Sequence, residues 1–376
     1  MKVCLVSAIN PRNTPYLKDS RATAYLGGLR FKFWIEKYTR HKVDVIHSDV
    51  EDVWSVDYSQ YDYVGITSYY PTMQYDLEFA KWVKENAPDT TIMFGGQNPT
   101  FWPEPYLKVG DIVVKWEGEK GLVHVLENDI REGIIDSPEL TMEEWREATM
   151  GINYEAAPWE KIWDFNRKNY GLGPAVRLIT QIGCKRGCVF CSTSNFIRIP
   201  KYLTTQQLRQ LCDRVAKFMP DDAILILQGD DELYGRARRR FFELYEQGYR
   251  FPRPVSLQTE VRRIDEETVR VLKGLGVFEV CLGIESFSDN ILREFNKKAT
   301  VKENEECLGL LLKYGIRPYA NIILRGLNSR EEDVEYTLQR IEYWKKRGVK
   351  FGINERVIPL PGTKVWSLQH ATQAKP

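Results

Sequence analysis

The stretch Gly183-Cys184-Lys185-Arg186-Gly187-Cys188-Val189-Phe190-Cys191 places three cysteines in one short loop with the spacing CxxxCxxC. The loop directly follows residues 177–183, whose apolar pattern predicts a buried strand. Thiolates are the ligands that select iron–sulfur clusters and zinc, and spacings of two or three residues let one loop surround several metal corners. The loop therefore indicates a metal centre at a strand end.

The number of thiols separates the two kinds of metal centre. A structural zinc site takes four ligands, but no second cysteine pair follows the loop, and the four histidines are scattered along the chain. Three cysteines suit a [4Fe–4S] cluster that keeps one iron open for another ligand. We therefore favour such a cluster on Cys184, Cys188 and Cys191, with a zinc site or unconnected thiols as the alternatives.

The chain around the loop alternates between strand and helix patterns. Such alternation predicts parallel strands, because parallel pairs need crossover connections. Six strands with intervening helices predict an open, partial (β/α)6 barrel, whose functional groups lie at the carboxyl ends of the strands. The predicted strands are residues 177–183, 223–228, 255–261, 277–286, 318–324 and 352–359, and the predicted helices are 204–218, 237–247, 265–275, 301–314 and 331–347.

The first third of the chain predicts a separate α/β domain, a Rossmann-like doubly wound sheet. A polar turn is expected at residues 10–15, after the first strand. The predicted strands are residues 2–7, 42–48, 63–68, 91–94 and 111–114, and the predicted helices are 22–38, 75–86 and 119–128. The expected domains are residues 1–135, a connector at 136–173 with no clean period, the barrel at 174–366 and a short tail at 367–376.

Composition narrows the function classes further. The chain has 376 residues with 53 basic and 52 acidic side chains and a net charge of +1, so we expect no nucleic-acid or anionic membrane surface. The longest apolar runs are far shorter than a membrane span, and we expect a cytoplasmic protein. Seven unevenly spaced cysteines predict reduced thiols. The single thiols Cys212, Cys281 and Cys307 are interpreted as small core residues, so no second cluster is expected.

Together with the cysteine triplet, several strand ends make residues 173–366 resemble the radical S-adenosylmethionine (SAM) superfamily. Phe190 matches the aromatic residue that this superfamily places beside adenine. Residues 228–232, Gln-Gly-Asp-Asp-Glu, resemble its acidic motif for the amino group of SAM, and a buried ammonium does require such acceptors. The resemblance implies that SAM and the [4Fe–4S] cluster are cofactors. The implied cofactor-binding residues are Phe190, Gln228, Asp230, Asp231, Glu260, Glu285, Ser286, Asn321 and Leu360.

These carboxylates also have plainer explanations. The acidic segment at 230–232 could be a solvated turn, since charge clusters are ordinary on surfaces. Glu285 follows an apolar strand and therefore needs a partner, which is either SAM or a structural salt bridge inside the barrel.

Residues 1–135 resemble the cobalamin-binding domain that precedes the barrel in one radical SAM subgroup. The resemblance rests on glycines and small hydroxyl residues at expected strand ends, which let a loop approach a ligand closely. The DxHxxG signature of a lower cobalt ligand is absent, and Asn98 stands where the subgroup often has histidine. Cobalamin is therefore possible but not established, and a scaffold without cofactor is the alternative. The matching segments are residues 25–29, 65–68, 94–100 and 116–119.

The resemblance implies that SAM is cleaved to a 5′-deoxyadenosyl radical, which abstracts hydrogen from a carbon of the substrate. The main hypothesis is rearrangement, cleavage or epimerisation of a precursor peptide or related natural product, with an external electron donor and a small accessory or recognition protein. The alternatives are a cobalamin-dependent radical SAM methyltransferase and, from another class, a non-catalytic iron–sulfur or zinc protein.

Overall fold

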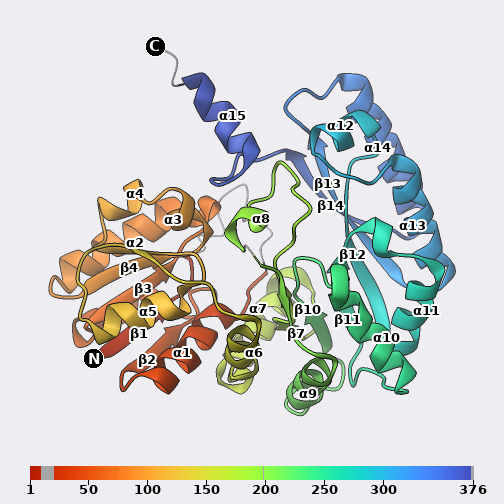
Figure 1. The fold of residues 1–376 in the computed structure, drawn as a ribbon. Helices are drawn as coiled ribbons and strands as arrows, with labels where there is room; N and C mark the ends of the chain where they lie inside the picture. The colour runs from red at the N-terminus through yellow and green to blue at the C-terminus, as the bar shows by residue number, and fades with distance from the viewer. Residues whose placement is uncertain (10–20, 198, 374–376) are drawn as a thin grey trace. The chain divides into compact units, whose positions relative to one another are not determined.

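The computed structural model describes residues 1–9, 21–197 and 199–373 (Figure 1). The polar turn expected at residues 10–15 lies outside these ranges, as does the end of the expected tail at 374–376. The chain forms two compact units, Met1–Pro174 and Ala175–Pro376.

The first unit is built on one parallel six-stranded sheet in the order β2-β1-β3-β4-β5-β6. The chain order changes direction between β1 and β3, which is where such open sheets form a crevice at their carboxyl edge. The sixth strand escaped prediction because it is an exposed edge strand without an apolar run. The strands are β1 (Lys2–Val6), β2 (Lys42–Ile46), β3 (Tyr63–Thr67), β4 (Thr91–Gly95), β5 (Ile112–Lys115) and β6 (Gly133–Asp136).

Helices cover both faces of this sheet. Alternate residues of a strand point to opposite faces and pack into two separate hydrophobic clusters. On one face Cys4 and Val6 belong to a cluster with Phe79 of α2. On the other face Val3 packs in a cluster with Ile35 of α1 and with residues of α5. The doubly wound prediction is confirmed. The helices of this part are α1 (Leu26–Tyr38), α2 (Met73–Asn86), α3 (Gln97–Phe101), α4 (Glu104–Leu107) and α5 (Gly118–Glu127).

The expected connector is more regular than its sequence pattern indicated. It contains α6 (Met142–Met150) and α7 (Trp159–Tyr170), and both belong to the first unit. Thr141 and Glu144 form a reciprocal capping box that begins α6. Trp145 of this helix is fully buried. The capping pattern was present in the sequence, but Pro138 and Pro158 favoured the interpretation of this segment as an irregular connector.

The second unit is the predicted partial barrel: a parallel sheet in the order β14-β13-β12-β11-β10-β7, with β7 and β14 at its two edges (Figure 1). The first predicted strand is shorter than expected, because the chain leaves β7 (Ala175–Leu178) and pairs β8 (Gln181–Ile182) with β9 (Lys201–Tyr202) in a small antiparallel ribbon. The other strands are β10 (Ile224–Leu227), β11 (Val255–Thr259), β12 (Val277–Glu285), β13 (Arg317–Arg325) and β14 (Lys350–Arg356).

Helices connect successive barrel strands as predicted, with two additions. Short helices follow the cysteine loop and β12, and residues 367–373 of the expected tail are helical because α15 continues through them. The helices of the second unit are α8 (Thr193–Phe196), α9 (Thr205–Ala216), α10 (Arg239–Glu246), α11 (Glu266–Leu275), α12 (Asp289–Glu294), α13 (Val301–Lys313), α14 (Glu331–Lys345) and α15 (Lys364–Gln373).

Candidate active site

The cysteine loop runs from the end of β8 to the start of α8. Gly183 and Gly187 have φ values of +84° and +71°, which favour glycine. At Gly183 a Cβ would also lie 2.9 Å from Cα of Pro200. Glycine is therefore required for this path of the loop, which leaves the three thiols half-buried.

The chemistry of the loop fits a thiolate-ligated cluster. In the part of the chain that the structure describes, no three His, Cys, Asp or Glu side chains are grouped as a ready-made metal site. The three cysteines nevertheless lie in one short loop. Burial raises the pKa of Cys184 to about 11, and the nearby charge of Cys188 contributes to the increase. Burial also raises the pKa of Cys188, and the positive charge of Lys297 opposes it. The positive charges of Arg186 and Lys297 oppose these increases and favour the thiolate form of Cys184 and Cys188 when a metal binds.

Arg186, inside the cysteine loop, anchors the loop to two barrel strands. Its Nη2 and Nε lie 2.6 and 2.9 Å from Oδ2 of Asp231, which follows β10. Its Nη1 lies 2.6 Å from Oε1 of Glu260, which follows β11. All three side chains are buried, at 12%, 3% and 8% exposure. Because a buried charge requires a partner, these contacts fix the middle of the loop.

Asp230 holds the beginning of the same loop. Its Oδ2 accepts a hydrogen bond from the backbone N–H of Gly183 at 2.6 Å, and its Oδ1 accepts one from Thr193 at 3.4 Å. Burial raises the pKa of this carboxyl, and the two hydrogen bonds oppose the increase. Glu232 instead points into the protein, where it pairs with Arg240 at 2.9 Å. Asp231 and Glu232 are therefore buried, whereas Asp230 is exposed and holds the loop from the surface, so the acidic segment is a set of anchors and not a free solvated turn.

Glu285 ends β12 in a left-handed conformation, with φ +64°. Its Oε1 lies 3.1 Å from Nζ of Lys297, and the two side chains are 10% and 8% exposed. The salt-bridge partner considered for Glu285 from the sequence is thus present, and it is Lys297.

The carboxyl edge of the first unit carries a buried polar network. Oδ1 of Asp76 accepts a hydrogen bond from the N–H of Ile9 at 2.7 Å, and Oδ2 accepts from the hydroxyls of Ser68 at 2.5 Å and Thr72 at 2.6 Å. Burial raises the pKa of Asp76 to about 7, against the effect of these hydrogen bonds. The network extends through Ser68 to the hydroxyl of Tyr106 at 2.8 Å.

Close backbone approach also marks this edge. Gly96 has φ +107°, and a Cβ there would lie 2.7 Å from the carbonyl oxygen of Ser68. Asn98, where the subgroup often has histidine, is 2% exposed and donates to the hydroxyl of Tyr106 at 2.5 Å. Among the described residues, Oδ1 of Asn98 has no hydrogen-bond partner. Glycine is therefore required where these two strand ends meet, and the Asn98 side chain points into the interior.

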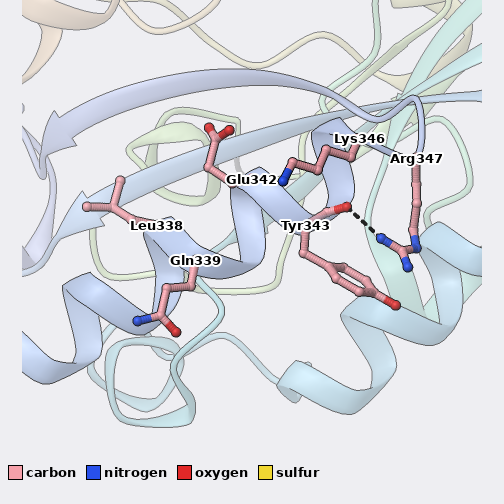
Figure 2. Close-up of a pocket in the computed structure, with 6 residues that line it drawn as sticks. All are labelled: Leu338, Gln339, Glu342, Tyr343, Lys346 and Arg347. Carbon is pink, nitrogen blue, oxygen red and sulfur yellow. Dashed lines mark hydrogen bonds between the residues drawn. The ribbon is translucent and has the colours of Figure 1, made fainter.

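A pocket elsewhere contains none of these groups. It lies along α14 and the turn after it, where Arg347 donates to the carbonyl oxygen of Tyr343 at 3.0 Å (Figure 2). The residues that line it are Leu338, Gln339, Glu342, Tyr343, Lys346 and Arg347.

Comparison with known families decides the nature of the second unit. Residues 178–341 match the Radical SAM superfamily. This part of the chain is a radical SAM domain. The superfamily uses a [4Fe–4S] cluster and SAM, so the domain is an enzyme domain that cleaves SAM with these cofactors.

Similar proteins extend over both units. The chain is 23% identical over 348 residues to an uncharacterized methyltransferase of Pyrococcus horikoshii, covering 87% of this chain and 74% of that protein. It is 25% identical over 310 residues to hopanoid C-3 methylase of Methylococcus capsulatus, covering 77% of this chain but only 57% of that enzyme. The methyltransferase TsrM of Kitasatospora setae, solved with cobalamin and a [4Fe–4S] cluster, has a TM-score of 0.76 at 13% identity, covering 99% of this chain and 75% of TsrM.

Several residues expected to bind cofactors gather around the cysteine loop of the radical SAM domain. Phe190 packs edge-on against Phe295, with ring centroids 5.2 Å apart. The turn at Leu360, whose carbonyl oxygen accepts from Thr363, leads to Val365, whose N–H donates to the carbonyl oxygen of Val189 at 3.2 Å. The expected residues around the loop are Phe190, Asp230, Asp231, Glu260, Glu285 and, through this turn, Leu360. Their contact with SAM stays a prediction.

The side chains of three other expected residues make no described hydrogen bond to the loop. Ser286 is fully buried, and its hydroxyl is 3.2 Å from that of Thr337 on α14. Asn321 lies on β13 and donates to Sγ of Cys281 at 3.2 Å. Gln228 ends β10 with an exposed side chain.

One cysteine prediction needs a correction, and two functional cations were not predicted. Cys281 was expected in the core, but it is half-exposed, since it lies on the face of β12 whose residues alternate with the buried ones. Cys212 and Cys307 are buried as expected. Sequence reasoning also missed Arg186 and Lys297. Arg186 could have been found from its position between two cysteines, but nothing in the sequence pairs Lys297 with Glu285.

One further finding concerns membranes. None of the helices within the described ranges is long and apolar enough to cross a bilayer.

Proposed function

We propose that this chain is a cobalamin-dependent radical SAM methyltransferase that acts on a carbon of a small molecule or peptide. The two curated relatives named above are a methyltransferase and a methylase, and the structural neighbour is a methyltransferase solved with cobalamin. These findings favour methyl transfer over the main hypothesis from the sequence, modification of a precursor peptide by hydrogen abstraction. The observation that carries the proposal is the anchored cysteine loop in a radical SAM domain that follows a doubly wound sheet.

The residues of the loop have distinct roles in the proposal. Cys184, Cys188 and Cys191 would hold three irons, and the open iron would bind SAM. The cluster, when bound, supplies the electron that cleaves SAM, and cobalamin supplies a carrier for the methyl group. Arg186 fixes the loop against Asp231, which keeps the thiols at the carboxyl end of the barrel.

The first unit would hold cobalamin at the carboxyl edge of its sheet. Gly96 lets the loop after β4 pack directly against the backbone of Ser68, so two neighbouring strand ends meet closely at this edge. Asn98 is buried and bonded to Tyr106, so the proposal assigns it no role as a lower cobalt ligand. An external one-electron donor belongs to the proposal, because the described residues include no second cysteine cluster.

Two measurements on the full chain test this proposal. After anaerobic reconstitution, the protein should bind about four irons and, with SAM and dithionite, form 5′-deoxyadenosine or a demethylated product of SAM. Cys188→Ala should lose the iron, whereas the matched control Cys281→Ala should keep it, because Cys281 lies on β12 away from the loop. One bound zinc without iron would identify the non-catalytic alternative.

The cobalamin part has its own measurement. Protein made with hydroxocobalamin should keep a corrin absorption band after desalting, and it should methylate an acceptor only when both cofactors are loaded. A reconstituted cluster without any retained corrin would contradict methyl transfer and return the precursor-peptide hypothesis to first place.

A further inference from the structure

A three-residue segment after α12 runs along the cysteine loop of the radical SAM domain. The carbonyl oxygen of Phe295 accepts a hydrogen bond from the N–H of Val189 at 3.1 Å. Next in the chain, Nδ2 of Asn296 donates to the carbonyl oxygen of Gly187 at 2.8 Å. The two contacts lie on either side of Cys188, so this segment fixes the backbone that carries the second thiol.

Asn296 is suited to this contact by its conformation. Its φ is +53°, a region that asparagine adopts more readily than most residues. Its Oδ1 accepts a hydrogen bond from Nζ of Lys298 at 2.6 Å. With the oxygen occupied, the amide nitrogen faces Gly187. The turn at Asn296 then leads directly into Lys297.

Lys297 places a buried positive charge beside Cys188. Its side chain is 8% exposed and pairs with Glu285. The pair occupies the space over Gly283, where a Cβ would lie 2.9 Å from Nζ of Lys297 and 2.6 Å from Oε1 of Glu285. The charged and titratable groups that act on Lys297 are Glu285, Cys188 and Glu260.

The cations near the loop are not equivalent. Arg186 is paired with two carboxylates, Asp231 and Glu260. Within the described residues, Lys297 has one carboxylate partner at ion-pair distance, Glu285. Three thiolates and the electron that reduces a cluster add negative charge to a site with little solvent, where charges interact strongly. A fixed cation there favours the reduced form.

We infer that Lys297 is a positioning and charge-balancing residue for the cluster: its ammonium holds Glu285 beside the loop and stabilises the reduced cluster on the three cysteines. The inference deepens the proposed function and rests on its cluster, but not on methyl transfer or on cobalamin. Nearby charges and hydrogen bonds to the ligands are among the features that set the potentials of iron–sulfur clusters.

The test is a redox titration of the reconstituted full chain, followed by electron paramagnetic resonance in the absence of SAM and cobalamin. Lys297→Met should lower the ratio of reduced to oxidised cluster at a given potential by about tenfold, which corresponds to about 59 mV for one electron. Lys297→Arg keeps the charge and should restore the ratio to within about twofold, or about 18 mV. Lys302→Met removes an exposed lysine of α13 and should behave as the unchanged protein.

A second variant decides the matter if Lys297→Met fails to fold or to bind iron. Glu285→Gln leaves the lysine charge unopposed and should move the potential in the opposite, more positive direction. An unchanged potential in iron-loaded Lys297→Met would overturn the inference, as would a negative shift in Glu285→Gln. Loss of the methyl-transfer proposal would leave these potentials unaffected, because neither SAM nor cobalamin is present in the measurement.

Discussion

Ionisation of Asp76 should destabilise the first unit progressively as the pH rises from about 4 to about 7. Its carboxyl has an ordinary pKa of 3.8, which burial raises to about 7 in the folded protein. The folded state therefore binds the proton more tightly than the unfolded state. The stabilisation is complete below pH 3.8 and is lost as the pH rises to about 7. At roughly 1.4 kcal/mol per pKa unit, the loss reaches at most about 4 kcal/mol.

Asp76→Asn isolates this contribution, because the amide cannot ionise and keeps the shape of the neutral carboxyl. Its oxygen can accept from the N–H of Ile9, and its nitrogen can donate to the hydroxyl of Ser68, which now donates to Asp76. The variant should match the unchanged protein below about pH 4 and become more stable than it by up to about 4 kcal/mol at pH 8. Asp89→Asn, which removes an exposed carboxylate from the same unit, is the control.

Hydrogen exchange in urea, followed by mass spectrometry of peptides from α2, measures the opening free energy of this unit separately from the barrel. The free-energy difference between Asp76→Asn and the unchanged protein should increase from pH 5 to about pH 7 and then level off. A constant difference over this range would refute the reasoning, since it would mean that Asp76 does not titrate there.

Three other perturbations test the radical SAM domain. Arg186→Lys cannot bridge Asp231 and Glu260 and should cost about 3 kcal/mol of stability, measured by thermal unfolding together with lower iron retention. Asn296→Ala removes the donor to the Gly187 carbonyl oxygen and should lower cluster occupancy severalfold, measured as iron per chain, while the fold stays intact by circular dichroism. Iodoacetamide should modify the half-exposed Cys281 before the buried single thiols. At pH 8 the reaction should be about a hundredfold slower than that of an ordinary thiol, because burial raises the pKa of Cys281 from 9.0 to about 11. Equal labelling of a fully buried thiol would contradict this prediction.

Local sequence signals predicted the framework of the protein. Alternating strand and helix patterns depend on residues close in the sequence, and they correctly predicted both sheets and the strand end that carries Cys184. The same reasoning failed where structure depends on partners far along the chain. Arg186 meets Asp231 across 45 residues, and this pairing exists only because neighbouring strand ends meet at one edge of the barrel. The edge strand β6 was missed for a related reason, because it is stabilised by pairing with β5 and has no apolar pattern of its own.

The cysteine loop illustrates how these distant partners produce a site. Between β8 and α8 the loop has no strand or helix of its own, so its shape depends on contacts with the barrel. Asp230 holds the beginning of the loop and Arg186 anchors its middle. Lys297 lies near Cys188 and pairs with Glu285. These contacts come from the ends of β10, β11 and β12 and from the turn after α12. A loop held in this way keeps its thiols near one another before a cluster binds, which reduces the conformational entropy that cluster assembly must overcome.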